Sequence, residues 1–233
     1  MSLLIGKIQK IEPILSETEI CFSGAIAITP DERESINKKG YLYAVFEILG
    51  ETPQEPTLVS KLIKDILGRS YYHSENISPI QSLEKAILEV QKDVALWGAD
   101  PQENGLAEKL GGIKLNITAA VLWAGVLYAV KFGEGSVKIM RGGSFKEANL
   151  ISEGNFSVAT GMTKKEDVLI LSTKNFAQKF SYQKLLEFTP KDVASLKPTE
   201  CCLMIKFETD KVLGEEEQIQ ESFGKSKKTS TLP

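Results

Sequence analysis

The chain has one histidine and three cysteines among its 233 residues, which leaves few side chains for histidine-based catalysis or thiolate metal sites. His73 has no second histidine to work with, and no Gly-x-Ser-x-Gly segment exists to serve a Ser-His-Asp hydrolase. Cys201 and Cys202 are neighbours in a predicted strand, so their side chains point to opposite faces and are poorly placed to form a disulfide. These patterns predict a reduced, cytoplasmic protein in which His73 is a loop residue and the cysteines pack in the core.

The sequence also lacks an excess of positive charge and long apolar runs. There are 28 Lys and Arg against 31 Asp and Glu, and the net charge of -3 argues against the basic stripe of a nucleic-acid-binding protein. No apolar segment is long enough to span a bilayer, and the N-terminal MSLLIG is too short for a signal-peptide core. Glycine-rich nucleotide loops and internal repeats are absent as well. We therefore expect no nucleic-acid partner and no membrane span.

The first half of the chain changes from a two-residue period to a helical period. Strands are expected at residues 7–15, 19–28 and 40–49, with a charged loop at 29–39. A proline then opens each of two segments with helical apolar stripes, residues 56–72 and 79–97. The second stripe consists of Leu83, Ile87, Val90, Val94 and Trp97, and Gly98 is expected to end this helix.

In the second half the two-residue period returns after a polar connector at residues 99–112. One face of the next strand carries only apolar residues, namely Ile113, Leu115, Ile117, Ala119, Val121 and Trp123. Further strands are expected at 126–132, 136–141, 168–173 and 201–208, with a hairpin at 141–151, a helix at 174–188 and a helical turn after Pro190. Residues 211–233 are polar, so we expect one domain over 1–210 followed by a disordered tail or linker. The KSKK cluster at 225–228 is expected to be solvated, with contact to an acidic surface as the alternative.

This order of elements predicts an α+β protein. Many antiparallel strands bury their apolar faces well as two stacked sheets with helices on the outside, which is a four-layer α/β/β/α sandwich. The two long helices should lie side by side on one sheet. Burial is expected for Leu115, Ile117, Leu122, Val121, Tyr128, Val130 and Leu169.

Four segments in this order resemble the metal-dependent serine/threonine phosphatases of the protein phosphatase 2C family. They are AVFEILGE at 44–51, NITAAVLWAGVLYAVKFG at 116–133, KFGEGSVKIMRGG at 131–143 and KEDVLILSTKNF at 165–176, and the similarity spans about residues 20–208. The resemblance implies a β-sandwich flanked by helices. It also implies a chemistry in which two Mg²⁺ or Mn²⁺ ions, held by aspartates, activate a water that attacks phosphoserine or phosphothreonine.

The chain departs from this family at the positions where the family binds metal. Glu47 stands at the first metal-binding aspartate, and the bulky Ile48 follows it where the family has a small residue. Lys174 and Asn175 replace an Asp-Gly pair, and Glu134 occupies a position that is usually aspartate. Two further motifs are lost: Asp-Asn before the last strand reads Thr199-Glu200, and Arg33 and Asn37 are out of register with the family's phosphate-binding arginine motif.

Lys174 is the most serious of these changes. A lysine ammonium about 4 Å from a divalent ion costs about 8 kcal/mol at an effective dielectric constant near 20. Mg²⁺ also requires nearly octahedral geometry, which the longer side chain of Glu47 disturbs. We therefore expect no catalytic residues and no metal; if a metal binds, Glu47, Glu134 and Glu200 would be its ligands. Without metal, Glu47 is interpreted as a partly solvated acid at a strand end that pairs with Lys174, directly or through water.

Three functions remain open. The first is a phosphatase 2C-like domain that is not an enzyme, needs no cofactor and acts as a regulatory module or by binding another protein. The second is an active Mg²⁺- or Mn²⁺-dependent serine/threonine protein phosphatase with atypical ligands. The third is a structural domain that assembles with itself as a homo-oligomer.

Overall fold

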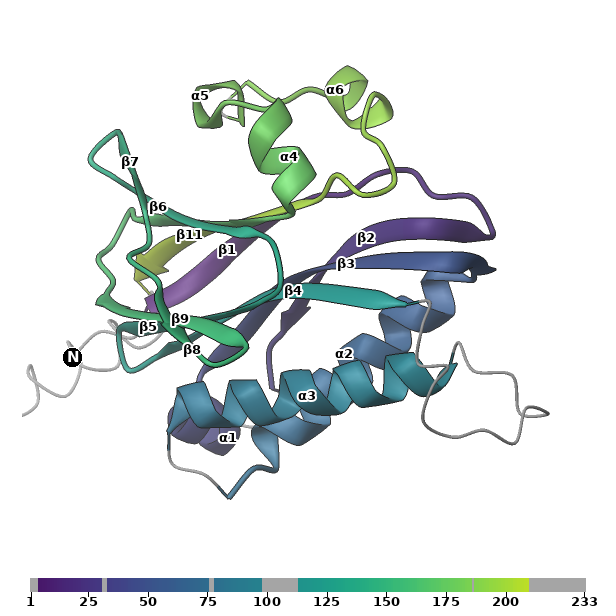
Figure 1. Ribbon diagram of the computed structural model, residues 1–233. Coiled ribbons are helices and arrows are strands. Elements are labelled where there is room, and N and C mark those ends of the chain that lie inside the picture. The colour runs from purple at the N-terminus through teal and green to yellow at the C-terminus, as the bar shows by residue number, and fades with distance from the viewer. Residues whose placement is uncertain (1–3, 31–32, 76–77, 98–112, 186, 210–233) are drawn as a thin grey trace, which may run out of the picture.

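Two stacked antiparallel sheets form the centre of the protein, and helices cover both outer faces (Figure 1). The computed structural model describes residues 4–30, 33–75, 78–97, 113–185 and 187–209. This arrangement confirms the α+β class and the four-layer α/β/β/α sandwich. None of the described helices has both the length and the apolar character needed to cross a membrane.

The larger sheet has six strands in the order β2-β3-β4-β5-β9-β8, and all its pairs are antiparallel. Its strands are β2 (Glu19–Ile28), β3 (Tyr41–Gln54), β4 (Lys114–Trp123), β5 (Val126–Phe132), β8 (Ile151–Glu153) and β9 (Phe156–Met162). The smaller sheet has five strands in the order β1-β11-β10-β6-β7. They are β1 (Leu4–Ile11), β6 (Ser136–Arg141), β7 (Ser144–Glu147), β10 (Val168–Ser172) and β11 (Cys202–Thr209).

Six helices complete the described part of the chain. They are α1 (Arg33–Lys39), α2 (Pro56–Tyr72), α3 (Pro79–Trp97), α4 (Lys174–Lys179), α5 (Tyr182–Leu185) and α6 (Pro190–Ala194). The long helices α2 and α3 lie side by side under the six-stranded sheet, as predicted, and α4 to α6 lie over the five-stranded sheet (Figure 1).

Three apolar clusters fill the spaces between the two sheets and the two groups of helices. The first lies between the six-stranded sheet and α2 and α3, and it contains Leu115, Ile117, Val121 and Val130. The second lies between the two sheets and contains Leu122 and Leu169, which confirms their predicted position. The third lies between the five-stranded sheet and the short helices around Phe176. Tyr128 is less completely buried than these residues but is not exposed.

The predictions for three parts of the chain need correction. The charged loop at 29–39 contains α1, which is supported by an ion pair between Glu34 and Lys38 and by the indole of Trp123, which donates to the Asn37 carbonyl oxygen. The expected helix at 174–188 is two helices, because Phe180 adopts an extended backbone conformation after α4. The third correction is β9, an unpredicted strand that pairs with β5 along its whole length and carries the short edge strand β8.

Several predictions fall on residues outside the described ones. These are the helix end at Gly98, the connector at 99–112 and the tail at 211–233, together with the side chain of Trp97.

Candidate functional site

The residues that replace the expected metal ligands come from three parts of the fold. Glu47 is on β3, Glu134 is in the turn between β5 and β6, and Lys174 and Asn175 begin α4. Glu47 lies two residues after Val45, whose side chain is in the layer between the sheets, so the Glu47 side chain points to that same face. Only 4% of Glu47 is exposed. A buried carboxylate at this place needs hydrogen-bond donors from the protein.

Two asparagines supply these donors. Asn116 is directly opposite Glu47 on β4, and its Nδ2 donates to Glu47 Oε2 at 2.7 Å. Asn175 Nδ2 donates to Glu47 Oε1 at 3.4 Å and to Thr199 Oγ1 at 3.0 Å. The interpretation of Glu47 as a partly solvated acid paired with lysine was therefore wrong: the side chain is buried, and its hydrogen-bond partners are amides.

Glu134 joins the same group from the other side. Its backbone N–H donates to Asn116 Oδ1 at 3.1 Å, and its carboxylate accepts from Lys174 Nζ at 2.7 Å. The expected direct pairing of Lys174 with Glu47 is thus replaced by pairing with Glu134. Glu47, Asn116, Glu134, Lys174 and Asn175 form a chain of hydrogen bonds between the six-stranded sheet and α4, which we call the edge network.

Gly133 allows the turn to approach Asn116 this closely. Its φ of +73° is in the left-handed region, and a Cβ atom at this position would lie 2.3 Å from Asn116 Oδ1. A larger residue would therefore push the turn away from β4 and break the hydrogen bond of the Glu134 N–H.

The two carboxylates of the edge network have opposite pKa shifts. Burial raises the pKa of Glu47 and the charge of Glu134 adds to this, whereas the Asn116 hydrogen bond and the charges of Lys114 and Lys174 act against it. The hydrogen bond from Lys174 lowers the pKa of Glu134, which is exposed to solvent. Glu47 and Lys174 are therefore close enough to interact electrostatically, as expected for two residues at the same edge of the sandwich.

Glu200, the third candidate ligand, is held elsewhere. It is buried just before β11, and its Oε2 accepts from Lys179 Nζ at 2.7 Å and from the Lys197 N–H at 2.9 Å. The structure therefore brings Glu47 and Glu134 together and binds Glu200 to a lysine of α4. Among the described residues, no three His, Cys, Asp or Glu side chains form a group that could hold a metal ion.

The remaining candidate residues have structural surroundings. His73 is exposed at the end of α2, and its Nδ1 lies 3.0 Å from the Arg69 carbonyl oxygen. Cys201 and Cys202 are fully buried, which raises the pKa of both thiols, and Cys21 is half-buried with a free thiol. Core packing is confirmed for Cys201 and Cys202 but only in part for Cys21.

The sequence did not lead us to predict that Asn116 and Asn175 donate hydrogen bonds to Glu47. A signal for Asn116 was present, because it is a polar residue inside an otherwise apolar strand, and such a residue requires a buried partner. Its partner Glu47 is 69 positions away, so the pairing became visible only once β3 and β4 were aligned.

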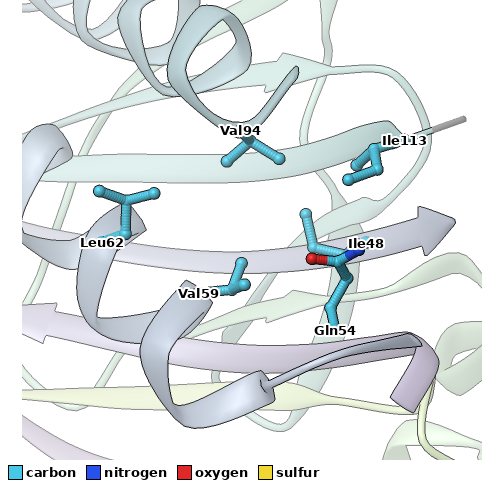
Figure 2. A pocket seen from close by; sticks show the side chains of 6 residues that line it. All are labelled: Ile48, Gln54, Val59, Leu62, Val94 and Ile113. Atoms are coloured by element: carbon cyan, nitrogen blue, oxygen red, sulfur yellow. The ribbon is translucent and has the colours of Figure 1, made fainter. Parts of the chain in front are cut away.

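A crevice between the long helices and the six-stranded sheet offers no competing site. It lies between α2, α3 and the six-stranded sheet, and Figure 2 shows its lining of Ile48, Gln54, Val59, Leu62, Val94 and Ile113. The crevice has essentially no room for a water molecule. It belongs to the apolar core.

Comparison with known proteins finds similar folds but no similar sequences. No family model matches the chain, and no curated protein sequence matches it significantly. Solved structures do match: the catalytic domain of the serine/threonine phosphatase PstP in complex with two manganese ions has a TM-score of 0.57 at 11% identity, covering 88% of this chain and 98% of that one. A serine/threonine phosphatase of S. agalactiae has a TM-score of 0.57 at 11% identity, covering 89% and 100%. The phosphatase MsPP from Mycobacterium smegmatis has a TM-score of 0.55 at 11% identity, covering 90% and 100%. The chain therefore has the fold of phosphatase 2C-like serine/threonine phosphatase domains, as its resemblance to that family implied.

Proposed function

We propose that this chain is a non-catalytic phosphatase 2C-like module with a regulatory or protein-binding role. The edge network is the observation that carries this proposal. Glu47 accepts hydrogen bonds from two amides and Glu134 accepts one from Lys174, so both carboxylates already have partners from the chain itself. An incoming divalent ion would have to displace these partners.

The charges support the same conclusion. Two divalent ions bring four positive charges, whereas Glu47 and Glu134 supply at most two negative charges, and Lys174 cancels one of them. Asn116 and Asn175 direct N–H groups toward Glu47, and these groups repel a cation. This set of side chains therefore does not fit a two-metal centre, and we assign neither metal ligands nor catalytic residues.

The extent, partner and location of the module are parts of the same proposal. The module covers residues 1–210 and needs no cofactor, and its partner is another protein. Three cysteines without a disulfide are typical of a reducing compartment, which favours the cytoplasm.

Calorimetric titration with Mn²⁺ and an aryl phosphatase assay test the proposal. We expect no binding heat at sub-millimolar Mn²⁺ and no turnover of an aryl phosphate or a phosphothreonine peptide. The PstP catalytic domain, whose structure contains two manganese ions, serves as the positive control. Stoichiometric Mn²⁺ binding with turnover by the unmodified chain would establish an active phosphatase with atypical ligands instead.

Light scattering after size-exclusion chromatography addresses self-assembly separately. A module that binds a different protein is expected to be monomeric over a wide concentration range. A stable oligomer at micromolar concentration would favour the structural-domain alternative.

A further inference from the structure

A groove of about 560 Å³ opens at one end of the sandwich, beside the edge network. It lies between residues 18–21 at the start of β2, Pro53 near the end of β3 and residues 197–199 before β11. We call it the end groove. Thr199 lines the end groove and also accepts the hydrogen bond from Asn175, so the groove and the edge network share a residue.

The end groove combines apolar walls with an acidic rim. Ile20 lines it with 48% of its surface exposed, next to Pro53 and Pro198. Large apolar side chains that remain exposed in a concave site are typical of binding surfaces.

The acidic rim consists of Glu19, which lines the groove on β2, and of exposed glutamates within two residues of other lining residues. Glu17 precedes Thr18, and Glu51 and Glu55 lie two residues before and after Pro53. Lys197 is the positive residue in the groove lining. A segment that fills this groove should therefore carry an apolar side chain and several positive charges.

The chain itself contains such a segment outside the described residues. Residues 223–228 read FGKSKK, with an aromatic residue followed by three lysines within four positions. The acidic run at 215–217 lies between this segment and β11 and would be repelled by the rim. Charge complementarity thus selects the basic part of the tail over its acidic part.

The tail is long enough to reach the groove. β11 ends at Thr209, which pairs with Leu4, whereas its start at Cys202 pairs with Ile11 near the end groove. The path back along β11 is about 23 Å at about 3.3 Å per residue. The chain between Thr209 and Phe223 can span about 46 Å when extended, which leaves length to spare.

We propose that residues 223–228 of this chain dock in its own end groove. Phe223 would contact the apolar walls at Ile20 and Pro198, and Lys225, Lys227 and Lys228 would face the acidic rim. The docked segment would lie beside Thr199 and the edge network, so it would compete with any partner that binds at this end of the sandwich.

Cys21 provides a reporter for this docking. It lines the groove and is half-buried with a free thiol, whereas Cys201 and Cys202 are fully buried. A neutral thiol reagent such as N-ethylmaleimide should therefore label one cysteine of the folded chain, at a rate set by how often the groove is open. The number of labelled thiols also reports on folding, because an unfolded variant would expose all three.

The test compares full-length variants that each lose three positive charges. Replacing Lys225, Lys227 and Lys228 with glutamine should increase the labelling rate of Cys21 about three- to fivefold, an effect that several screened surface charge pairs can produce. The matched control replaces Lys64, Lys85 and Lys92, which are exposed on α2 and α3, and should leave the rate unchanged. Added salt should accelerate labelling of the unmodified chain and of the control, but not of the tail variant.

Two further measurements separate this proposal from other occupants. Glu17→Lys with Glu51→Lys should also accelerate labelling, and the additional replacement of the three tail lysines with glutamate should restore protection. Protection that increases with protein concentration would mean that the tail of a second copy fills the groove, which would overturn docking within one chain. Equal labelling rates for the tail variant and the unmodified chain would also overturn it, and neither result depends on whether the module is catalytic.

Discussion

Asn116→Ala is the sharpest test of the edge network, because one side chain connects both carboxylate-bearing segments. Its Nδ2 donates to Glu47 at 2.7 Å, and its Oδ1 accepts from the Glu134 N–H at 3.1 Å. A hydrogen bond to a charged group contributes about 1.5–3 kcal/mol and a neutral one about 0.5–1.5 kcal/mol. We therefore expect Asn116→Ala to reduce the free energy of unfolding by about 2–4 kcal/mol above neutral pH.

This loss should depend on pH with a definite sign. Burial raises the pKa of Glu47 above its ordinary value of 4.5, and the Asn116 hydrogen bond counteracts the rise, so the variant should raise the pKa further. A carboxyl group with a higher pKa in the folded state keeps its proton longer there than in the unfolded chain. Stability then falls as the pH rises from the unfolded pKa through the folded pKa. The destabilisation by Asn116→Ala should consequently be larger at pH 8 than at pH 5.

Urea denaturation followed by circular dichroism at both pH values measures this difference. Tyr71→Phe is the matched control, because Tyr71 on α2 is equally buried and its hydroxyl donates to the Lys39 carbonyl oxygen at 2.8 Å, away from the edge network. We expect the control to lose stability equally at both pH values. The reasoning is refuted if Asn116→Ala loses the same amount at pH 5 and pH 8, or if the control shows the same pH dependence.

Three further predictions concern the core, an ion pair and metal binding. Leu122→Ala and Leu169→Ala should each cost about 2–5 kcal/mol in urea denaturation because both side chains lie fully between the sheets, and smaller losses at both would contradict this packing. Arg141→Ala should reduce the free energy of unfolding by about 2–3 kcal/mol, because it removes the hydrogen bonds from Arg141 to the buried Asp167 carboxylate at 2.9 and 2.6 Å. Burial alone would raise the pKa of Asp167, but these bonds and the bond from the Lys164 N–H lower it. This stability is present above the unfolded pKa of Asp167 and is lost as the pH falls through the folded pKa, so acid denaturation should show a smaller difference between variant and unmodified chain. Lys174→Asp should restore little Mn²⁺ binding in calorimetric titration, because the amides of Asn116 and Asn175 still donate to the Glu47 carboxylate. Strong Mn²⁺ binding by this single variant would contradict the charge argument.

The elements with strong local periodicity were predicted well from sequence. The helices that begin at Pro56 and Pro79 are present at the expected residues, and the apolar face of β4 packs on them. Their side-chain spacing is a property of consecutive residues, so the pattern alone defines which face is buried. The short elements α1 and β9 were missed, because α1 gains support from Trp123 across the fold and β9 gains its partners from β5.

The sequence by itself also indicated that the family's metal-binding positions are altered in this chain. A protonated lysine at 174 has no lone pair to offer a metal where the family has an aspartate, and this follows from side-chain chemistry without any structure. The sequence likewise contains the apolar alternation that makes a two-sheet sandwich favourable.

The tertiary structure alone decided which of these side chains meet. Glu47 was expected to face Lys174, but β4 places Asn116 against it, and the turn after β5 brings Glu134 to the lysine. The partners in the edge network are between 18 and 128 positions apart in the chain. Local periodicity carries no information about contacts over such separations in the chain. The strand register places Asn116 against Glu47, and Gly133 lets the turn that carries Glu134 approach Asn116 closely.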